Sequence, residues 1–228
     1  MNPLVDPQLG ERVINLMAAM VLVLQIGMVT QRWLMANVRI FAAQSFLLAA
    51  IAATIAYFNN APHIYVAAAL TLVLKGIVLP VLLTRLVAKV GIRQEIEPLV
   101  NVPVSILISA GLTLLGYLVA ESFYHPAGLG IASTLGHNTL AVAISLFLIG
   151  FFMMVNRRKA ITQVLALLSL ENGLFLAAIA LTYGMPLVVE LGVFFDLLVG
   201  TMALGILVYR IRETFDSMDV SKLRKLRG

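Results

Sequence analysis

The sequence contains no cysteine and one tryptophan, and only 12% of its 228 residues are charged. Without cysteine the chain can form neither disulfides nor thiolate-ligated zinc or iron–sulfur sites. Its histidines, His63, His125 and His137, show no metal-ligand spacing and are expected near helix ends, so we assign no metal site. We therefore expect no cofactor to be held by this chain itself.

Hydrophobic residues are present in excess, at 61% of the chain with a mean hydropathy of +1.00. A soluble domain of this length and composition would aggregate. The net charge of +5 and the pI near 9.7 would suit a nucleic-acid binder only if the basic residues formed one face, whereas they lie between apolar runs. The composition therefore predicts a protein whose surroundings are the lipid bilayer, with no nucleic acid as partner.

Several apolar runs reach the length of about 20 residues that a membrane-spanning helix needs. We expect such helices at 13–30, 39–57, 64–87, 103–121, 138–155, 160–182 and 186–209. The segment before Arg12 lacks the basic region of a cleaved secretory signal, so the first helix is expected to remain. The sequence predicts an all-α integral membrane fold of about seven transmembrane helices.

Basic residues occur almost entirely in alternate connections. They are Arg32, Arg39, Arg85, Lys89, Arg93, Arg157, Arg158 and Lys159, with six more in the tail from Arg210 to Arg227. Loops 58–63, 122–137 and 183–185 contain none. The positive-inside rule then predicts an N-terminus outside and a C-terminus in the cytoplasm. We expect a four-helix half at 1–125 and a three-helix half with the basic tail at 126–228.

Three ionisable residues fall inside the apolar runs: Lys75, Glu171 and Asp196. From their distance to the helix ends, all three should lie about 15–17 Å below the outer surface, near the middle of the bilayer. Such residues are costly to insert and often mark ion routes. A static pair that fixes helix register remains the alternative. Glu190, only about 6 Å below the outer end of its helix, is expected at the interface, with uptake or release of the ion as a possible role.

Other polar residues accompany these charges. Pro80 cannot donate to the carbonyl of Gly76, so a break in the third helix is expected beside Lys75, with a hydrated cavity around the lysine. Gln163, two turns from Glu171, could provide a further polar step. Residues Gln25, Gln44, Ser45 and Thr54 are expected to form hydrogen bonds between helices.

The C-terminal part of the chain resembles a known family. The stretches Asn156-Arg157-Arg158-Lys159 and Leu168-Ser169-Leu170-Glu171-Asn172-Gly173 are similar to the K-type (4L) subunit of respiratory complex I and to the C subunit of Mrp antiporters. Those proteins have three helices, a basic first loop and a buried glutamate, which Glu171 matches. Asp196 does not fall on the second glutamate of the K-type subunit, so no role is transferred to it from that family.

Over its full length the chain resembles hydrogenase-4 component E, a membrane subunit of formate-hydrogenlyase-type group 4 nickel–iron hydrogenases. The resemblance rests on residues 75–80, on Leu170-Glu171-Asn172-Gly173, on Val189-Glu190-Leu191-Gly192 and on Asp196. It implies antiporter-like membrane subunits, a membrane anchor subunit, and soluble hydrogenase and iron–sulfur subunits as partners. The nickel–iron and iron–sulfur centres would lie in those partners, in a complex of the bacterial or archaeal cytoplasmic (inner) membrane.

The resulting hypothesis is a non-catalytic membrane-arm subunit of an oxidoreductase complex, with Glu171, Asp196 and Lys75 on a proton or sodium path. Two alternatives stay open, a subunit of an Mrp-type antiporter and a membrane assembly scaffold. A rhodopsin-like pump is disfavoured because the last predicted helix, 186–209, has no lysine for a retinal Schiff base. A small transporter is disfavoured because no internal repeat is evident.

Overall fold

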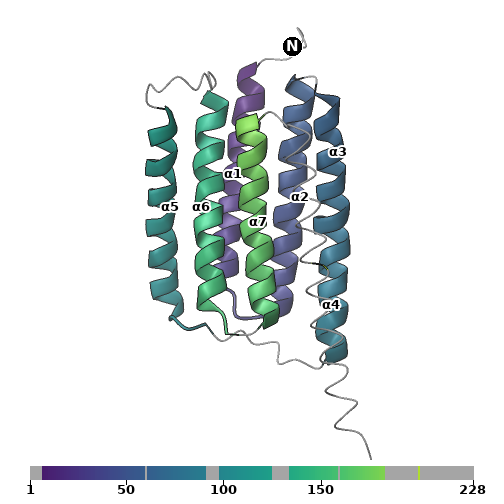
Figure 1. Ribbon diagram of the computed structural model, residues 1–228, viewed down its shortest axis with the longest axis vertical. Coiled ribbons are helices and arrows are strands. Elements are labelled where there is room, and N and C mark those ends of the chain that lie inside the picture. The colour runs from purple at the N-terminus through teal and green to yellow at the C-terminus, as the bar shows by residue number, and fades with distance from the viewer. Residues whose placement is uncertain are drawn as a thin grey trace, which may run out of the picture.

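The protein is a bundle of long helices that run side by side (Figure 1). The computed structural model describes residues 7–59, 61–90, 98–124, 134–158, 160–182 and 200. Within these residues, six helical stretches are long and apolar enough to cross a membrane. The chain is therefore a multi-pass, all-helical membrane protein.

The first six predicted spans are confirmed, with most ends extended by several residues. The elements are α1 (Pro7–Thr30), α2 (Leu34–Asn59), α3 (Pro62–Leu70), the π-helical segment η1 (Thr71–Val78), α4 (Leu79–Val90), α5 (Val102–Tyr124), α6 (Thr134–Asn156) and α7 (Ala160–Thr182). Since α2 begins at Leu34, Arg39 lies within that helix and not in the preceding connection. The predicted helix at 186–209 lies outside the described residues, apart from Gly200.

Successive spans alternate in direction, so the connections fall at two opposite ends of the bundle (Figure 1). The end that holds the α1–α2 and α6–α7 connections and the end of α4 also holds Arg32, Arg157 and Arg158. The end of α2, the start of α3, the end of α5 and the start of α6 lie at the other end. This arrangement matches the alternation of basic loops in the sequence.

The centre of the bundle is formed where α6 and α7 approach each other closely. A Cβ atom added at Gly150 would lie 2.7 Å from the backbone of Leu170, and one added at Gly173 would lie 2.6 Å from the backbone nitrogen of Phe147. Because neither position has room for a side chain, the two backbones can pack at short distance. The α1 helix lies behind this pair, α5 flanks α6, and α2 packs against both α7 and the third span (Figure 1).

The third span, residues 62–90, departs from α-helical geometry in its middle. In η1 the hydrogen bonds reach five residues back, as in the bond from the Leu79 N–H to the Leu74 carbonyl. Pro80 comes next and has no N–H to continue this pattern. The sequence predicts a break at Pro80 and Gly76, whereas the structure has an uninterrupted helix whose irregular stretch precedes the proline and contains Lys75 and Gly76.

Candidate functional site: a buried ion pair

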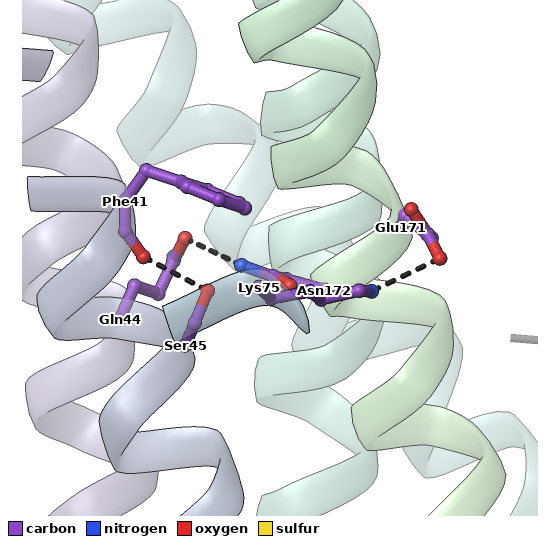
Figure 2. Close-up of polar contacts among 6 residues, drawn as sticks. All are labelled: Phe41, Gln44, Ser45, Lys75, Glu171 and Asn172. Carbon is purple, nitrogen blue, oxygen red and sulfur yellow. Dashed lines mark hydrogen bonds and ion pairs between the residues drawn. The ribbon is translucent and has the colours of Figure 1, made fainter. Parts of the chain in front are cut away.

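Two of the three predicted mid-membrane charges meet inside the bundle. The Lys75 Nζ lies 3.0 Å from Glu171 Oε1, and the two side chains are 2% and 6% exposed. Lys75 comes from η1 and Glu171 from the middle of α7, so the pair joins the third span to the last described helix (Figure 2). The prediction that these residues share one depth is confirmed.

An aromatic ring lies next to the lysine. The Nζ of Lys75 is 5.8 Å from the centroid of the Phe175 ring, one turn beyond Glu171 on α7. At that distance the ring face attracts a cation and at the same time excludes water from one side. The ammonium group is thus held by a carboxylate and a ring from the same helix.

The position of Lys75 on a π-helical stretch has a geometric consequence. A π turn contains more residues than an α turn, so it changes the direction in which the following side chains point. Such stretches are often found at functional sites. Within η1 only Thr71 and Lys75 are buried, so the stretch turns its two polar residues inward, whereas Val73, Ile77 and Val78 are exposed.

Four polar side chains form a second cluster close by in the bundle, which we call the amide tier: Gln25 of α1, Gln44 of α2, and Ser169 and Asn172 of α7. Asn172 Nδ2 donates to Gln44 Oε1 at 3.1 Å (Figure 2). Gln44 Nε2 in turn donates to Gln25 Oε1 at 2.9 Å. The Ser169 hydroxyl donates to the same oxygen of Gln25. All four side chains are fully buried.

The amide tier confirms part of the expectation for isolated polar residues. Gln25 and Gln44 do bond between helices, whereas Ser45 and Thr54 do not use their hydroxyls in this way. Ser45 donates to the carbonyl of Phe41 and Thr54 to that of Ala50, each within α2. Short hydroxyl side chains reach the carbonyl four residues back more readily than a neighbouring helix.

Gln163, the predicted polar step, bonds at the end of the bundle. Its side-chain amide donates to the carbonyl of Arg157 at 2.9 Å, at the α6–α7 connection. Gln163 therefore closes the end of the bundle and is directed away from Glu171.

That connection contains a buried arginine, whereas the sequence predicts it only as a basic residue of a loop. Arg157 is 3% exposed, and its Nη2 lies 3.0 Å from the carbonyl oxygen of Met28 and 3.3 Å from that of Val29. These carbonyls belong to the last turn of α1, where helix carbonyls lack partners and the helix dipole favours a cation. Burial lowers the pKa of Arg157 to about 10.

Asn156, the residue before Arg157, joins the α6–α7 connection to the segment that precedes α5. Asn156 accepts from the Leu99 N–H through its backbone and from the Val100 N–H through its side chain, at 2.9 and 2.8 Å. Its amide nitrogen donates to the Ser105 hydroxyl. Together Asn156 and Arg157 form what we call the loop clasp. In the sequence, the loop clasp is signalled only by the polar run Asn156-Arg157-Arg158-Lys159 directly after an apolar run.

Of the remaining predicted residues, some lie within the described structure and others do not. Asp196 and Glu190 lie outside the described residues, as does His125. His63 occupies the second position of α3 and His137 the first turn of α6, as expected for residues near helix ends. Gly76 lies within η1 and Pro80 within α4.

The fold and the buried pair define a polytopic membrane protein with a lysine–glutamate pair inside its helix bundle. Residues 138–228 match the family described as NADH-ubiquinone/plastoquinone oxidoreductase chain 4L. The match begins in α6 and includes Glu171, but neither Lys75 nor the glutamines of the amide tier. Those come from the part of the chain that precedes it.

Comparison with individual proteins identifies the family more closely. The chain is 37% identical over 201 residues to a Mycobacterium tuberculosis protein named Uncharacterized protein Rv0085, covering 87% of this chain and 89% of that protein. It is 23% identical over 219 residues to hydrogenase-4 component E of Escherichia coli, covering 96% and 99% of the two chains. No solved structure matches. The chain belongs to the hydrogenase-4 component E family, with a chain-4L-type C-terminal region.

Proposed function

We propose that this chain is a non-catalytic membrane-arm subunit of a hydrogenase or complex-I-like assembly and forms part of a proton or sodium path. The observation that supports this most directly is the ion pair of Lys75 and Glu171, buried in the middle of two apolar helices. Relatedness to a hydrogenase-4 subunit supports the setting in which the pair would work.

The physical argument concerns what a buried pair can do. Each charge alone costs about 2.5–3.5 kcal/mol to place at the bilayer centre on insertion scales. Pairing stabilises both charged forms, and separation of the pair favours the neutral form of each. An approaching ion or a displaced neighbouring charge can therefore change the protonation of Glu171, and that change is the elementary step of ion transfer.

The proposal includes the acidic residues of the predicted last helix. Asp196 is assigned as the third exchanging charge, at the depth of Lys75 and Glu171, and Glu190 as a carboxylate nearer the outer surface. The charge-rich connections would face the cytoplasm and the N-terminus the outside, in the inner membrane of a bacterium or archaeon. The halves at 1–125 and 126–228 would be the structural units of this subunit.

The assembly would supply what this chain lacks. Antiporter-like membrane subunits would continue the ion path laterally, and an anchor subunit would attach the peripheral arm. Soluble hydrogenase and iron–sulfur subunits would hold the nickel–iron and iron–sulfur centres, where the redox chemistry would occur. This division of labour follows from the proposed setting, and the same chain in an Mrp-type antiporter would have no redox partners.

The decisive experiment replaces Glu171 with Gln in the assembled complex and measures ion translocation in proteoliposomes together with electron transfer. We expect translocation to fall by at least about tenfold, because one titratable group is removed from a path with few alternatives. Glu121→Gln is the matched control, since Glu121 is an exposed carboxylate at the end of α5. Unchanged translocation by a fully assembled Glu171→Gln complex would remove this residue from the mechanism.

A scaffold role is favoured by one observation, the tight packing of the pair beside the amide tier. A buried ion pair can serve only to fix helix register. The double variant Lys75→Met/Glu171→Leu separates the two functions, because it removes both charges while keeping the volume. Assembly with normal ion translocation would support the scaffold, and assembly without translocation would support the path.

A further inference from the structure

The α7 helix presents two kinds of polar side chain in two directions. Ser169 and Asn172 are three residues apart and therefore lie on one face, which meets Gln25 of α1 and Gln44 of α2. Glu171 is adjacent to Asn172 in sequence, so it leaves the helix about 100° around the axis. Figure 2 shows Asn172 directed to Gln44 and Glu171 directed away from it.

The hydrogen bonds of the amide tier leave little freedom in how its side chains are oriented. Gln44 donates through Nε2 to Gln25 Oε1 and to the carbonyl of Val21, so its Oε1 is the atom left to accept from Asn172. Gln25 accepts from both Gln44 and Ser169 and donates to the sulfur of Met153 at 3.5 Å. Rotating α7 in either direction would break bonds to two different helices.

The close approach of α6 and α7 does not fix this rotation by itself. Gly150 and Gly173 set how near the two backbones lie, but a glycine contact has no side chain to interlock with its partner. The directional constraint on α7 comes from the hydrogen bonds of Ser169 and Asn172. Distance and rotation of the helix are thus fixed by different residues.

We infer that Gln44 and Gln25 are positioning residues for the ion pair, which hold α7 at the rotation that presents Glu171 to Lys75. The inference rests on the proposed function only in giving the ion pair a role in ion transfer. The geometry of the pair can be tested without measuring ion transport. Both glutamines lie outside the region that matches chain 4L, so the N-terminal helices supply the register for the glutamate as well as its counter-charge.

A zero-length cross-link measures this geometry. Dicyclohexylcarbodiimide enters membranes and adds to a carboxyl group to give an O-acylisourea. If the amine of Lys75 is in position, its nitrogen attacks the acyl carbon, an amide forms, and dicyclohexylurea leaves with the proton of the amine. If it is not, the adduct rearranges to a stable N-acylurea on Glu171. Mass spectrometry of the full-length, folded chain in detergent gives the ratio of the two products.

Three variants test the inference against the unaltered chain. Gln44→Leu should lower the ratio of amide to N-acylurea about fivefold, because it removes the one hydrogen bond that joins Gln44 to α7. Ser169→Ala should lower it less, by about twofold, because Asn172 still bonds. The exchange Gln44→Asn/Asn172→Gln keeps an amide–amide bond of the same total length and should restore most of the ratio.

Ser45→Ala is the matched control, since Ser45 is equally buried and adjacent to Gln44 but bonds only within α2. Its ratio should equal that of the unaltered chain. A ratio unchanged in Gln44→Leu, or in Ser169→Ala if the leucine variant does not fold, would overturn the positioning role. Absence of the amide in the unaltered chain would overturn the ion pair itself. A result from the transport experiment that contradicts the ion path, together with the expected cross-linking ratios, would overturn the proposed function and leave the positioning role intact.

Discussion

Two buried cationic groups in this protein are stabilised in different ways. Lys75 lies in the middle of the bundle and is neutralised by a side chain, the carboxylate of Glu171. Arg157 lies at the end of the bundle and is stabilised by backbone carbonyls of α1. A helix end offers fixed acceptors that do not titrate, whereas the helix middle offers none and the cation needs another ionisable group. The first arrangement depends on a second ionisable side chain, and the second depends only on the backbone.

The largest change in the free energy of unfolding should appear when Lys75 is removed. Lys75→Met leaves the Glu171 carboxylate without its counter-charge and should reduce the free energy of unfolding by about 3–5 kcal/mol. Adding Glu171→Leu should recover most of that loss, because the second charge is removed as well. Titration with sodium dodecyl sulfate, followed by circular dichroism, measures both. A double variant no more stable than the single one would show that the two residues are not energetically coupled.

Arg157→Met should have the next largest effect, since it removes charge-assisted hydrogen bonds to two carbonyls and exposes nothing titratable. The expected loss is about 1.5–3 kcal/mol. The cross-linking ratio of Lys75 and Glu171 should not change. Arg158→Met, which alters an exposed neighbour, is the control and should leave the unfolding transition in place. A change in the cross-linking ratio of Arg157→Met would contradict the independence of the two regions.

Gly173→Ala should affect the middle of the bundle and spare the loop clasp. Its Cβ would lie 2.6 Å from the backbone nitrogen of Phe147, so α7 must shift at a cost of about 1–3 kcal/mol. The shift should also lower the cross-linking ratio. Gly111→Ala on α5, where no atom lies within 4 Å, should be neutral or slightly stabilising. Equal stability of the two variants would argue against the close α6–α7 contact.

The smallest effect concerns pH. Burial lowers the pKa of Arg157 to about 10, so the folded chain binds fewer protons than the unfolded chain only near and above that pH. Stability contributed by the loop clasp should therefore stay constant from about pH 6 to about pH 8.5. The difference in unfolding free energy between the unaltered chain and Arg157→Met, measured across that range, should be flat. A slope would mean that another group titrates with the clasp.

Several features could be predicted because they depend on short stretches of sequence. The six described spans follow from apolar length, and the shared depth of Lys75 and Glu171 follows from counting residues along helices of known rise. The interhelical role of Gln25 and Gln44 follows from the cost of a buried amide without a partner.

Other features depended on distant segments and were missed. Arg157 is buried because α1 ends beside it, and no pattern near residue 157 contains that information. Ser45 was misassigned because serine can satisfy itself within its own helix. Pro80 correctly indicated an irregular third span. Which residues form the π-helix depends on how Thr71 and Lys75 pack against the other helices of the bundle.

The distance along the chain between the paired charges has a consequence for synthesis. Lys75 is translated roughly 100 residues before Glu171, which takes on the order of 5–20 s at ordinary elongation rates. During that time the third span must be accommodated by the insertion machinery or the bilayer without its carboxylate. Gln25 and Gln44 are synthesised before Lys75, so the glutamines of the amide tier can be in place before α7 brings the carboxylate.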